Sequence, residues 1–219
     1  MITFEQIKAD AAIRTYIMEA DAYLAEIGFT EHSFAHVTKV AETAKYILLT
    51  LGYSEREAEL AQIAGWLHDI GNIVNRVDHA QSGAVMAFRI LDNLGGDAAD
   101  IAKIVAAIGN HDEGTAVPIS AITAALILAD KSDVRYTRVR EQDPVKFDIH
   151  DRVNFAVREG RTYIDLEDRS VTLEMKIDTQ YCSVMDYFEI FLGRMMLCRR
   201  AAEYLSLSFR LMINGQRLL

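Results

Sequence analysis

Apolar residues recur at the helical spacing of three and four positions through the first 140 residues of the chain. Capping residues, among them Thr3, Ser54, Asp78 and Asp97, precede these stretches, and several are followed by a glycine. The pattern predicts helices over 3–28, 32–51, 54–69, 79–94, 97–110 and about 121–140, the last of them ended by Asp143-Pro144.

The pattern changes after this break. Residues 162–166 and 170–177 are rich in β-branched residues or alternate, so they predict a hairpin around 167–169. A long helix over about 181–205 follows, and alternation over 207–213 could add a third strand. We therefore expect a mainly α protein with an all-helical domain over 1–147. A small α+β extension over 148–219 would hold an antiparallel hairpin or three-stranded sheet and the long helix.

The composition is that of a soluble globular protein, with 51% hydrophobic and 25% charged residues among 219. No apolar run is long enough to span a bilayer, and Glu5, Lys8 and Asp10 interrupt any signal-like start, so we expect a cytoplasmic protein. A net charge of −9 disfavours an extended nucleic-acid partner. Cys182 and Cys198, expected on one helix and too far apart to pair, are interpreted as buried thiols.

Candidate chemistry begins at His68-Asp69, at the end of an apolar helix. Imidazole nitrogen and carboxylate oxygen together suit a divalent cation such as Fe, Mn, Co or Zn. Asp130 follows a segment that is apolar all round, so its carboxylate should be buried, where it needs either a metal or a salt-bridge partner. His111 has the alternative of a helix C-terminal residue favoured by the macrodipole. Single histidines such as His32 are interpreted as core or surface residues.

The series His36, His68-Asp69 and Asp130 is similar to the H…HD…D pattern of the HD-domain metal-dependent phosphohydrolase superfamily. The segments that carry this resemblance are His36-Val-Thr-Lys-Val-Ala-Glu-Thr-Ala, Ala64-Gly-Trp-Leu-His-Asp-Ile-Gly-Asn and Leu128-Ala-Asp-Lys-Ser-Asp. Two more segments, Asp78-His-Ala-Gln-Ser-Gly-Ala and Ala107-Ile-Gly-Asn-His-Asp-Glu-Gly, resemble the branches that bind two metals. The resemblance covers about residues 30–138. It implies an HD-type helical bundle whose metal ligands are His36, His68, Asp69, His79, His111 and Asp130.

Two differences from the branches that bind two metals argue against two classes of substrate. The cyclic-dinucleotide phosphodiesterases carry Gly-Tyr-Pro after their second histidine motif, whereas Gly114 here leads into Thr115-Ala-Val-Pro118. The symmetrical dinucleoside-tetraphosphate hydrolases have a longer segment than the eleven residues that separate His68 from His79. Neither substrate is therefore assigned.

The implied cofactor is a divalent metal, one or two ions, with Fe or Mn favoured and Mg, Co, Ni or Zn possible. Such an ion lowers the pKa of bound water from 15.7 to roughly 7–9, so a metal-bound hydroxide would attack phosphorus in a nucleotide or another small phosphate ester or anhydride. Asp69 would bridge two ions and, with Lys131, serve as a catalytic residue. Lys131, Arg135 and Arg138 form a stripe on the expected sixth helix, which could bind substrate phosphate with Asn72, or be a solvated face partly paired with Asp133.

Two other functions stay open from the sequence. A di-iron HD-fold oxygenase could use the same ligands to activate O₂. A metal-stabilised binding module could sense a nucleotide and signal through the extension. For partners we expect a small phosphorylated substrate, no membrane, and a homodimer through the extension, because its sheet has an edge that must be covered.

Overall fold

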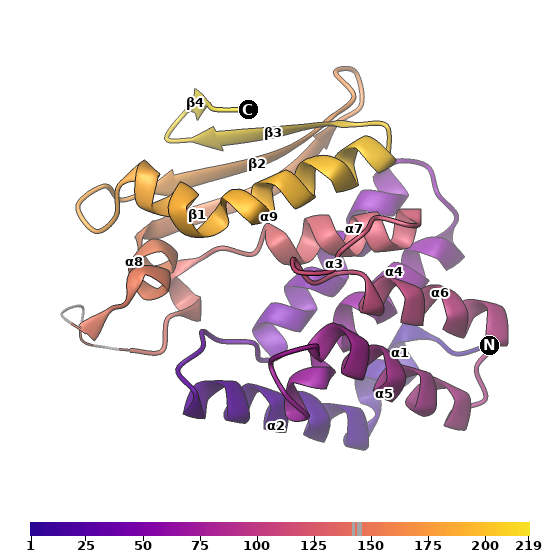
Figure 1. Ribbon diagram of the computed structural model, residues 1–219. Coiled ribbons are helices and arrows are strands. Elements are labelled where there is room, and N and C mark those ends of the chain that lie inside the picture. Colours follow the sequence, from indigo (N-terminus) through magenta and orange to yellow (C-terminus); the bar gives the residue numbers. More distant parts are fainter. Residues whose placement is uncertain (142, 144–145) are drawn as a thin grey trace. The chain divides into compact units, whose positions relative to one another are not determined.

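The computed structural model describes residues 1–141, 143 and 146–219 (Figure 1). Within these residues the chain forms two compact units, Met1–Asp130 and Lys131–Leu219. The predicted helix break at Asp143-Pro144 lies partly outside the described residues. The predicted domain boundary at residue 147 stays a prediction.

The first unit is helical. Its elements are α1 (Phe4–Ala9), α2 (Ala11–Glu26), α3 (Phe34–Thr50), α4 (Glu55–Leu67), the 3₁₀ helix η1 (Ile70–Ile73), α5 (His79–Asn93), α6 (Ala98–Gly109) and α7 (Ala121–Lys131). The predicted capping boxes at Thr3 and Ser54 are both present. Asp97 caps α6 by accepting from the backbone nitrogens of Ala99 and Asp100. These starts could be predicted because a capping box involves only four consecutive residues.

Three details of the predicted helices are wrong. The first predicted helix is two helices, because Asp10 is extended and its side chain accepts from the backbone nitrogen of Ile13 at the start of α2. Asp78 stands before α5 in a left-handed conformation (φ 57°) and makes no side-chain cap bond. The sixth helix ends at Lys131 rather than near Arg140. Beyond it, the backbone carbonyl of Asp133 accepts a hydrogen bond from the Arg138 side chain instead of continuing the helix.

The second unit is a sheet with helices. It contains the 3₁₀ helix η2 (Tyr136–Arg138), α8 (Ile149–Ala156), β1 (Val157–Asp165), β2 (Ser170–Ile177), α9 (Val184–Tyr204), β3 (Ser208–Ile213) and β4 (Gln216–Arg217). The strand order is β1-β2-β3-β4. The predicted hairpin is β1 and β2, paired antiparallel, and the possible third strand is β3. β3 pairs parallel with β2, because α9 forms the crossover between them and packs on both (Figure 1).

The predicted fold class, a helical domain with a small α+β extension, is confirmed. The sheet has a short fourth strand that was not predicted, and neither was α8. Cys182 lies just before α9, whose N-cap is Ser183, so only Cys198 is on the observed helix, and the prediction that both cysteines share it is wrong. Both cysteines are buried thiols. A homodimer through this extension stays a prediction.

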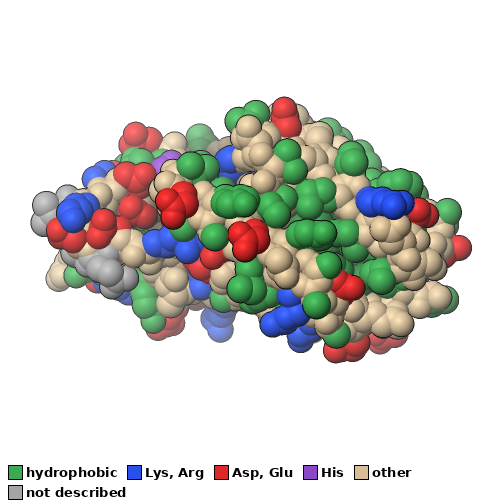
Figure 2. Space-filling view, turned by 90° about the horizontal axis from the view of Figure 1, so that it is seen from below, with side chains coloured by type: hydrophobic (Ala, Val, Ile, Leu, Met, Phe, Trp, Pro, Cys, Tyr) green, Lys and Arg blue, Asp and Glu red, His purple; other side chains and the backbone are tan. Residues whose placement is uncertain are grey.

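The face of the molecule that Figure 2 shows has no continuous patch of positive or of negative side chains among the described residues. Lys and Arg side chains stand apart there, among acidic and hydrophobic side chains. In the described part of the chain, none of the helices combines the length and apolar character of a membrane span. The absence of an extended nucleic-acid partner stays a prediction.

Candidate metal centre

Two close backbone approaches bring the ligand-bearing helices of the first unit together. The first is between α3, which carries His36, and α4, which leads into His68. A Cβ on Gly65 would lie 2.8 Å from the Cα and 2.9 Å from the nitrogen of Ala41, so only glycine allows the two helices this contact. The apolar faces of α3 and α4 thus place both histidines on one side of the interface.

The second approach is between η1 and the start of α5. A Cβ on Gly71 would overlap the backbone carbonyl oxygen of His79 and the backbone nitrogen of Gly83. Glycine at this position therefore lets the turn after Asp69 lie directly against the first turn of α5. As a result, Asp69 and His79 face the same pocket although ten residues separate them.

The side chains of His36, His68 and Asp130 form the inner group of the site. The Nε2 atoms of His36 and His68 are 3.3 Å apart. Oδ1 of Asp130 lies 3.4 Å from Nε2 of His36 and 3.7 Å from Nε2 of His68. Atoms from these three residues all lie within 4.8 Å of one another, although they come from α3, the end of α4 and α7.

Asp69 connects this group to the other two histidines. Its Oδ2 lies 3.5 Å from Nε2 of His36 and 3.2 Å from Nε2 of His68, whereas its Oδ1 lies 3.5 Å from Nε2 of His79. His111 forms a second group with His68 and Asp69, again within 4.8 Å. Its ring centroid is 5.0 Å from that of His68 and 5.2 Å from that of His79. The structure therefore brings together all six side chains that the resemblance implied as ligands.

The orientation of three histidines suits metal binding. In each, Nδ1 lies beside the backbone carbonyl oxygen three residues earlier, at 2.8 Å for His68, 3.1 Å for His79 and 2.6 Å for His111. Such a contact holds the proton on Nδ1 and leaves the lone pair of Nε2 directed into the pocket. The donor set of imidazole nitrogens and carboxylate oxygens is thus prepared for a divalent cation.

The spacing of the donors fits the same conclusion. Bonds of about 2.1 Å at tetrahedral or octahedral angles put neighbouring ligand atoms roughly 3.0–3.4 Å apart. The Nε2 atoms of His36 and His68 lie 3.3 Å from each other and 3.2 to 3.7 Å from the nearest carboxylate oxygens of Asp69 and Asp130. The four histidines are at most 2% exposed, and the side chains of Asp69 and Asp130 are 8% and 12% exposed. The predicted burial of Asp130 is therefore nearly complete.

The two carboxylates of the site, Asp69 and Asp130, favour the binding of a positive charge among the histidines. Burial opposes protonation of His68, but Asp69 and Asp130 outweigh it and raise its pKa to about 10. Burial likewise works against the Asp69 carboxylate, yet the neighbouring histidines hold its pKa well below the usual range. A proton or a metal cation can satisfy these carboxylates, so the two compete for the same site.

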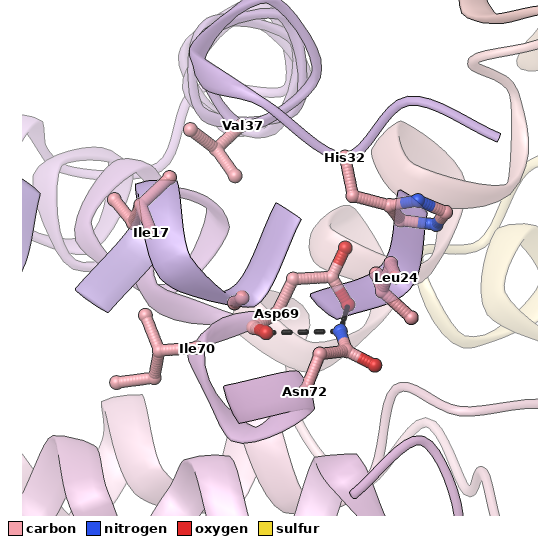
Figure 3. Close-up of a pocket in the computed structure, with 8 residues that line it drawn as sticks. Ile17, Leu24, His32, Val37, Asp69, Ile70 and Asn72 are labelled. Carbon is pink, nitrogen blue, oxygen red and sulfur yellow. Dashed lines mark hydrogen bonds between the residues drawn. The ribbon is translucent and has the colours of Figure 1, made fainter. Parts of the chain in front are cut away.

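Asn72 and His32 line the pocket beside Asp69 (Figure 3). The amide nitrogen of Asn72 donates to the carbonyl oxygen and to Oδ1 of Asp69, both at 2.9 Å, and therefore holds the carboxylate in place. The sequence interpretation of His32 as an ordinary core or surface residue missed this position. Its ring lies 5.4 Å from that of His36, and the spacing of four residues between the two was the available signal. Asp112, whose Oδ1 is 3.8 Å from Nε2 of His79, was also missed.

The three predicted cationic residues do not form one helical stripe. Lys131 is the buried last residue of α7, and the described stretch after it that carries the two arginines is not α-helical, since it contains only the 3₁₀ helix η2 at Tyr136–Arg138. Nε of Arg135 lies 3.0 Å from Oδ1 of Asp133, and Nη1 of Arg138 donates to the Asp133 carbonyl oxygen at 2.9 Å. The alternative pairing with Asp133 is thus present for both arginines. Substrate binding by Lys131, Arg135 and Arg138 stays a prediction.

Comparison with known proteins identifies the family. The model of the HD domain matches residues 33–189, well over half of the chain. The chain belongs to the HD domain family. The match continues past residue 138, where the resemblance in the sequence ends. Membership and the histidine and aspartate clusters together support a metal-dependent hydrolase in general.

A solved structure is also similar to this HD-domain protein. It is the crystal structure, at 1.45 Å resolution, of a predicted HD superfamily hydrolase from an uncultured Thermotogales bacterium. The sequence identity is 27%, the similarity covers 62% of this chain and 75% of that chain, and the TM-score is 0.46. A search of the curated proteins found no match.

Proposed function

We propose that this HD-domain protein is a metal-dependent phosphohydrolase that acts on a nucleotide or another small phosphate ester or anhydride. The observation that carries the proposal is the convergence of imidazole nitrogens and carboxylate oxygens from five helical segments on one buried centre. His36, His68, Asp69 and Asp130 would hold one divalent ion. His79 and His111, with the second oxygen of Asp69, would hold another.

Hydrogen bonds around the centre fix the direction of several of its ligand atoms. The carbonyl contacts of His68, His79 and His111 keep Nε2 directed inward, and Asn72 holds the Asp69 carboxylate in position through Oδ1. A bound divalent ion supplies a Lewis acid that makes water a nucleophile at neutral pH and stabilises charge on a phosphoryl group. The buried walls limit competing water, which strengthens every charge interaction inside the pocket.

An anionic substrate follows from the charge balance. Two divalent ions would bring four positive charges against the two carboxylates of Asp69 and Asp130, so the loaded centre would stay cationic. A phosphate ester or anhydride carries the matching negative charge in a compact group. Lys131, next to Asp130 in the sequence, is the further candidate for a catalytic charge.

The test is metal analysis of anaerobically purified protein, followed by a panel of nucleotides and small phosphate esters assayed with and without O₂. We expect metal-dependent release of phosphate or of a nucleotide in the absence of O₂. Product formed only with O₂ would favour the oxygenase. Tight nucleotide binding with no turnover across the panel would favour a binding module and contradict the proposal.

A further inference from the structure

Arg76 reaches the edge of the candidate metal centre, although the sequence pattern did not single it out. It lies in the loop between η1 and α5 and is half-buried. Its Nη1 is 3.3 Å from Oδ1 of Asn72 and 3.3 Å from Nε2 of His79. Its guanidinium lies over the ring of Phe29, 5.4 Å from the centroid. The side chain is therefore held by neutral groups on two sides.

The charge of Arg76 is not matched by a carboxylate. Among residues 1–141, 143 and 146–219, no acidic side chain forms an ion pair with it, and its hydrogen-bond partners are an amide oxygen and an imidazole nitrogen. A guanidinium has five N–H donors and prefers anions that accept two of them side by side. Most of this donor capacity is available, next to a pocket for which we propose an anionic substrate.

The contact with His79 indicates where the anion would lie. Nδ1 of His79 lies beside the carbonyl oxygen of Arg76 at 3.1 Å, so Nε2 carries the lone pair to which Arg76 donates. If Nε2 of His79 holds a cation, that lone pair is no longer an acceptor for the guanidinium. Two positive groups would then face each other at short range. An anion that contacts both of them removes the repulsion and replaces the lost hydrogen bond.

We infer that Arg76 recognises the anionic group of the substrate at the His79 side of the centre, with Asn72 orienting the guanidinium and Phe29 supporting its face. The inference rests on the proposed phosphohydrolase function for the identity of this group, a phosphoryl group. Arg76 would contact its oxygens directly. Asn72, which contacts both Arg76 and Asp69, would act as a positioning residue.

The experiment measures binding of inorganic phosphate to the metal-loaded full chain by titration calorimetry, with metal content determined on the same samples. Arg76→Gln should weaken phosphate binding by roughly 10- to 100-fold, because one charge-assisted hydrogen-bonded contact is lost. Arg76→Lys should fall between it and the wild type, since it keeps the charge without the planar fork. Arg89→Gln is the matched control, an exposed arginine on α5, and should bind phosphate as the wild type does. Metal content should be equal in all four proteins.

The outcomes separate this inference from the proposed function. Phosphate binding by Arg76→Gln at wild-type affinity, no binding by the wild type, or loss of metal from Arg76→Gln would each overturn the role of Arg76. An Arg76→Gln protein that hydrolyses a panel substrate with unchanged KM would do the same, while leaving the phosphohydrolase proposal intact. Conversely, phosphate binding that depends on Arg76 without hydrolysis of any panel compound would support the inference and contradict the proposed function.

Discussion

Two buried carboxylates, one in each compact unit, are balanced in different ways. Asp133 in the second unit is fully buried, and guanidinium nitrogens of Arg135 and Arg138 lie 3.0 and 3.9 Å from its oxygens. Asp69 in the first unit is 6% exposed, and imidazole nitrogens of His36, His68 and His79 surround its oxygens at 3.2 to 3.5 Å. Arginine carries a permanent charge, whereas neutral imidazole carries none.

This difference indicates that the Asp133 carboxylate stabilises the fold, whereas the Asp69 carboxylate serves the proposed metal site. A buried carboxylate needs a compensating positive charge. At Asp133 the chain supplies that charge itself, two and five residues further along. At Asp69 the chain supplies imidazoles, which carry a positive charge only while they hold an extra proton, and we propose that bound metal replaces that proton. Loss of the first carboxylate should therefore affect folding, and loss of the second should affect metal binding and activity.

The largest effect is expected for Asp69→Ala. This change removes the carboxylate whose two oxygens face both groups of histidines, so metal binding should fall and phosphate release should drop by about 10³-fold or more. Elemental analysis measures the bound metal, and the anaerobic assay measures the rate of phosphate release. A variant that keeps wild-type metal content and activity would show that Asp69 is a structural carboxylate like Asp133.

Asp133→Asn should cost stability rather than metal. The change leaves two arginines beside an uncharged amide, and breaking a buried ion pair costs about 3–5 kcal/mol. Urea unfolding followed by circular dichroism gives the free energy of unfolding. Metal content per folded molecule should stay at the wild-type value, and a stability loss below about 1 kcal/mol would show that the cluster around Asp133 is not needed for folding.

Asn72→Ala should have an intermediate effect, confined to the metal centre. The amide orients Asp69 through two hydrogen bonds of 2.9 Å, and loss of such a support typically lowers metal affinity or activity by about 10- to 100-fold. A metal-binding titration of Asn72→Ala beside Asp133→Asn compares the two sites directly. Unchanged affinity in Asn72→Ala would mean that the imidazoles alone position Asp69.

The smallest effect is expected for Cys182, a buried thiol. Unlike the two carboxylates, it stays uncharged and needs no compensating positive charge. Burial, with a further contribution from the Asp186 charge, raises the pKa of its thiol to about 11. The thiolate is the reactive form, so labelling of the native protein by a thiol reagent should be slow at pH 8 and should increase as the pH rises toward 11. Cys182→Ser identifies the contribution of this thiol. Rapid labelling of Cys182 at pH 8 would contradict the assigned burial.

Local signals explain which parts of the fold could be predicted. The capping boxes at Thr3 and Ser54 and the β1–β2 hairpin depend on neighbours in the sequence, and all three are present. α7 ends where Asp133 instead pairs with Arg135 and accepts a hydrogen bond from Arg138 in the segment that follows. Helical periodicity does not indicate this arrangement. The parallel pairing of β3 with β2 depends on how α9 packs, so the alternating pattern over 207–213 indicated a strand but not its direction.

The sequence by itself determined the types of side chain available to the centre, since the resemblance named six histidine and aspartate residues as ligands. Only the tertiary structure decided that they converge, because the contact of Gly65 with Ala41 and that of Gly71 with the start of α5 bring separate helices together. The places of His32 beside Asp69 and of Arg76 over the ring of Phe29 were decided there too. These two contacts join segments that are far apart in the chain, and periodicity and motif spacing carry no information about such distances.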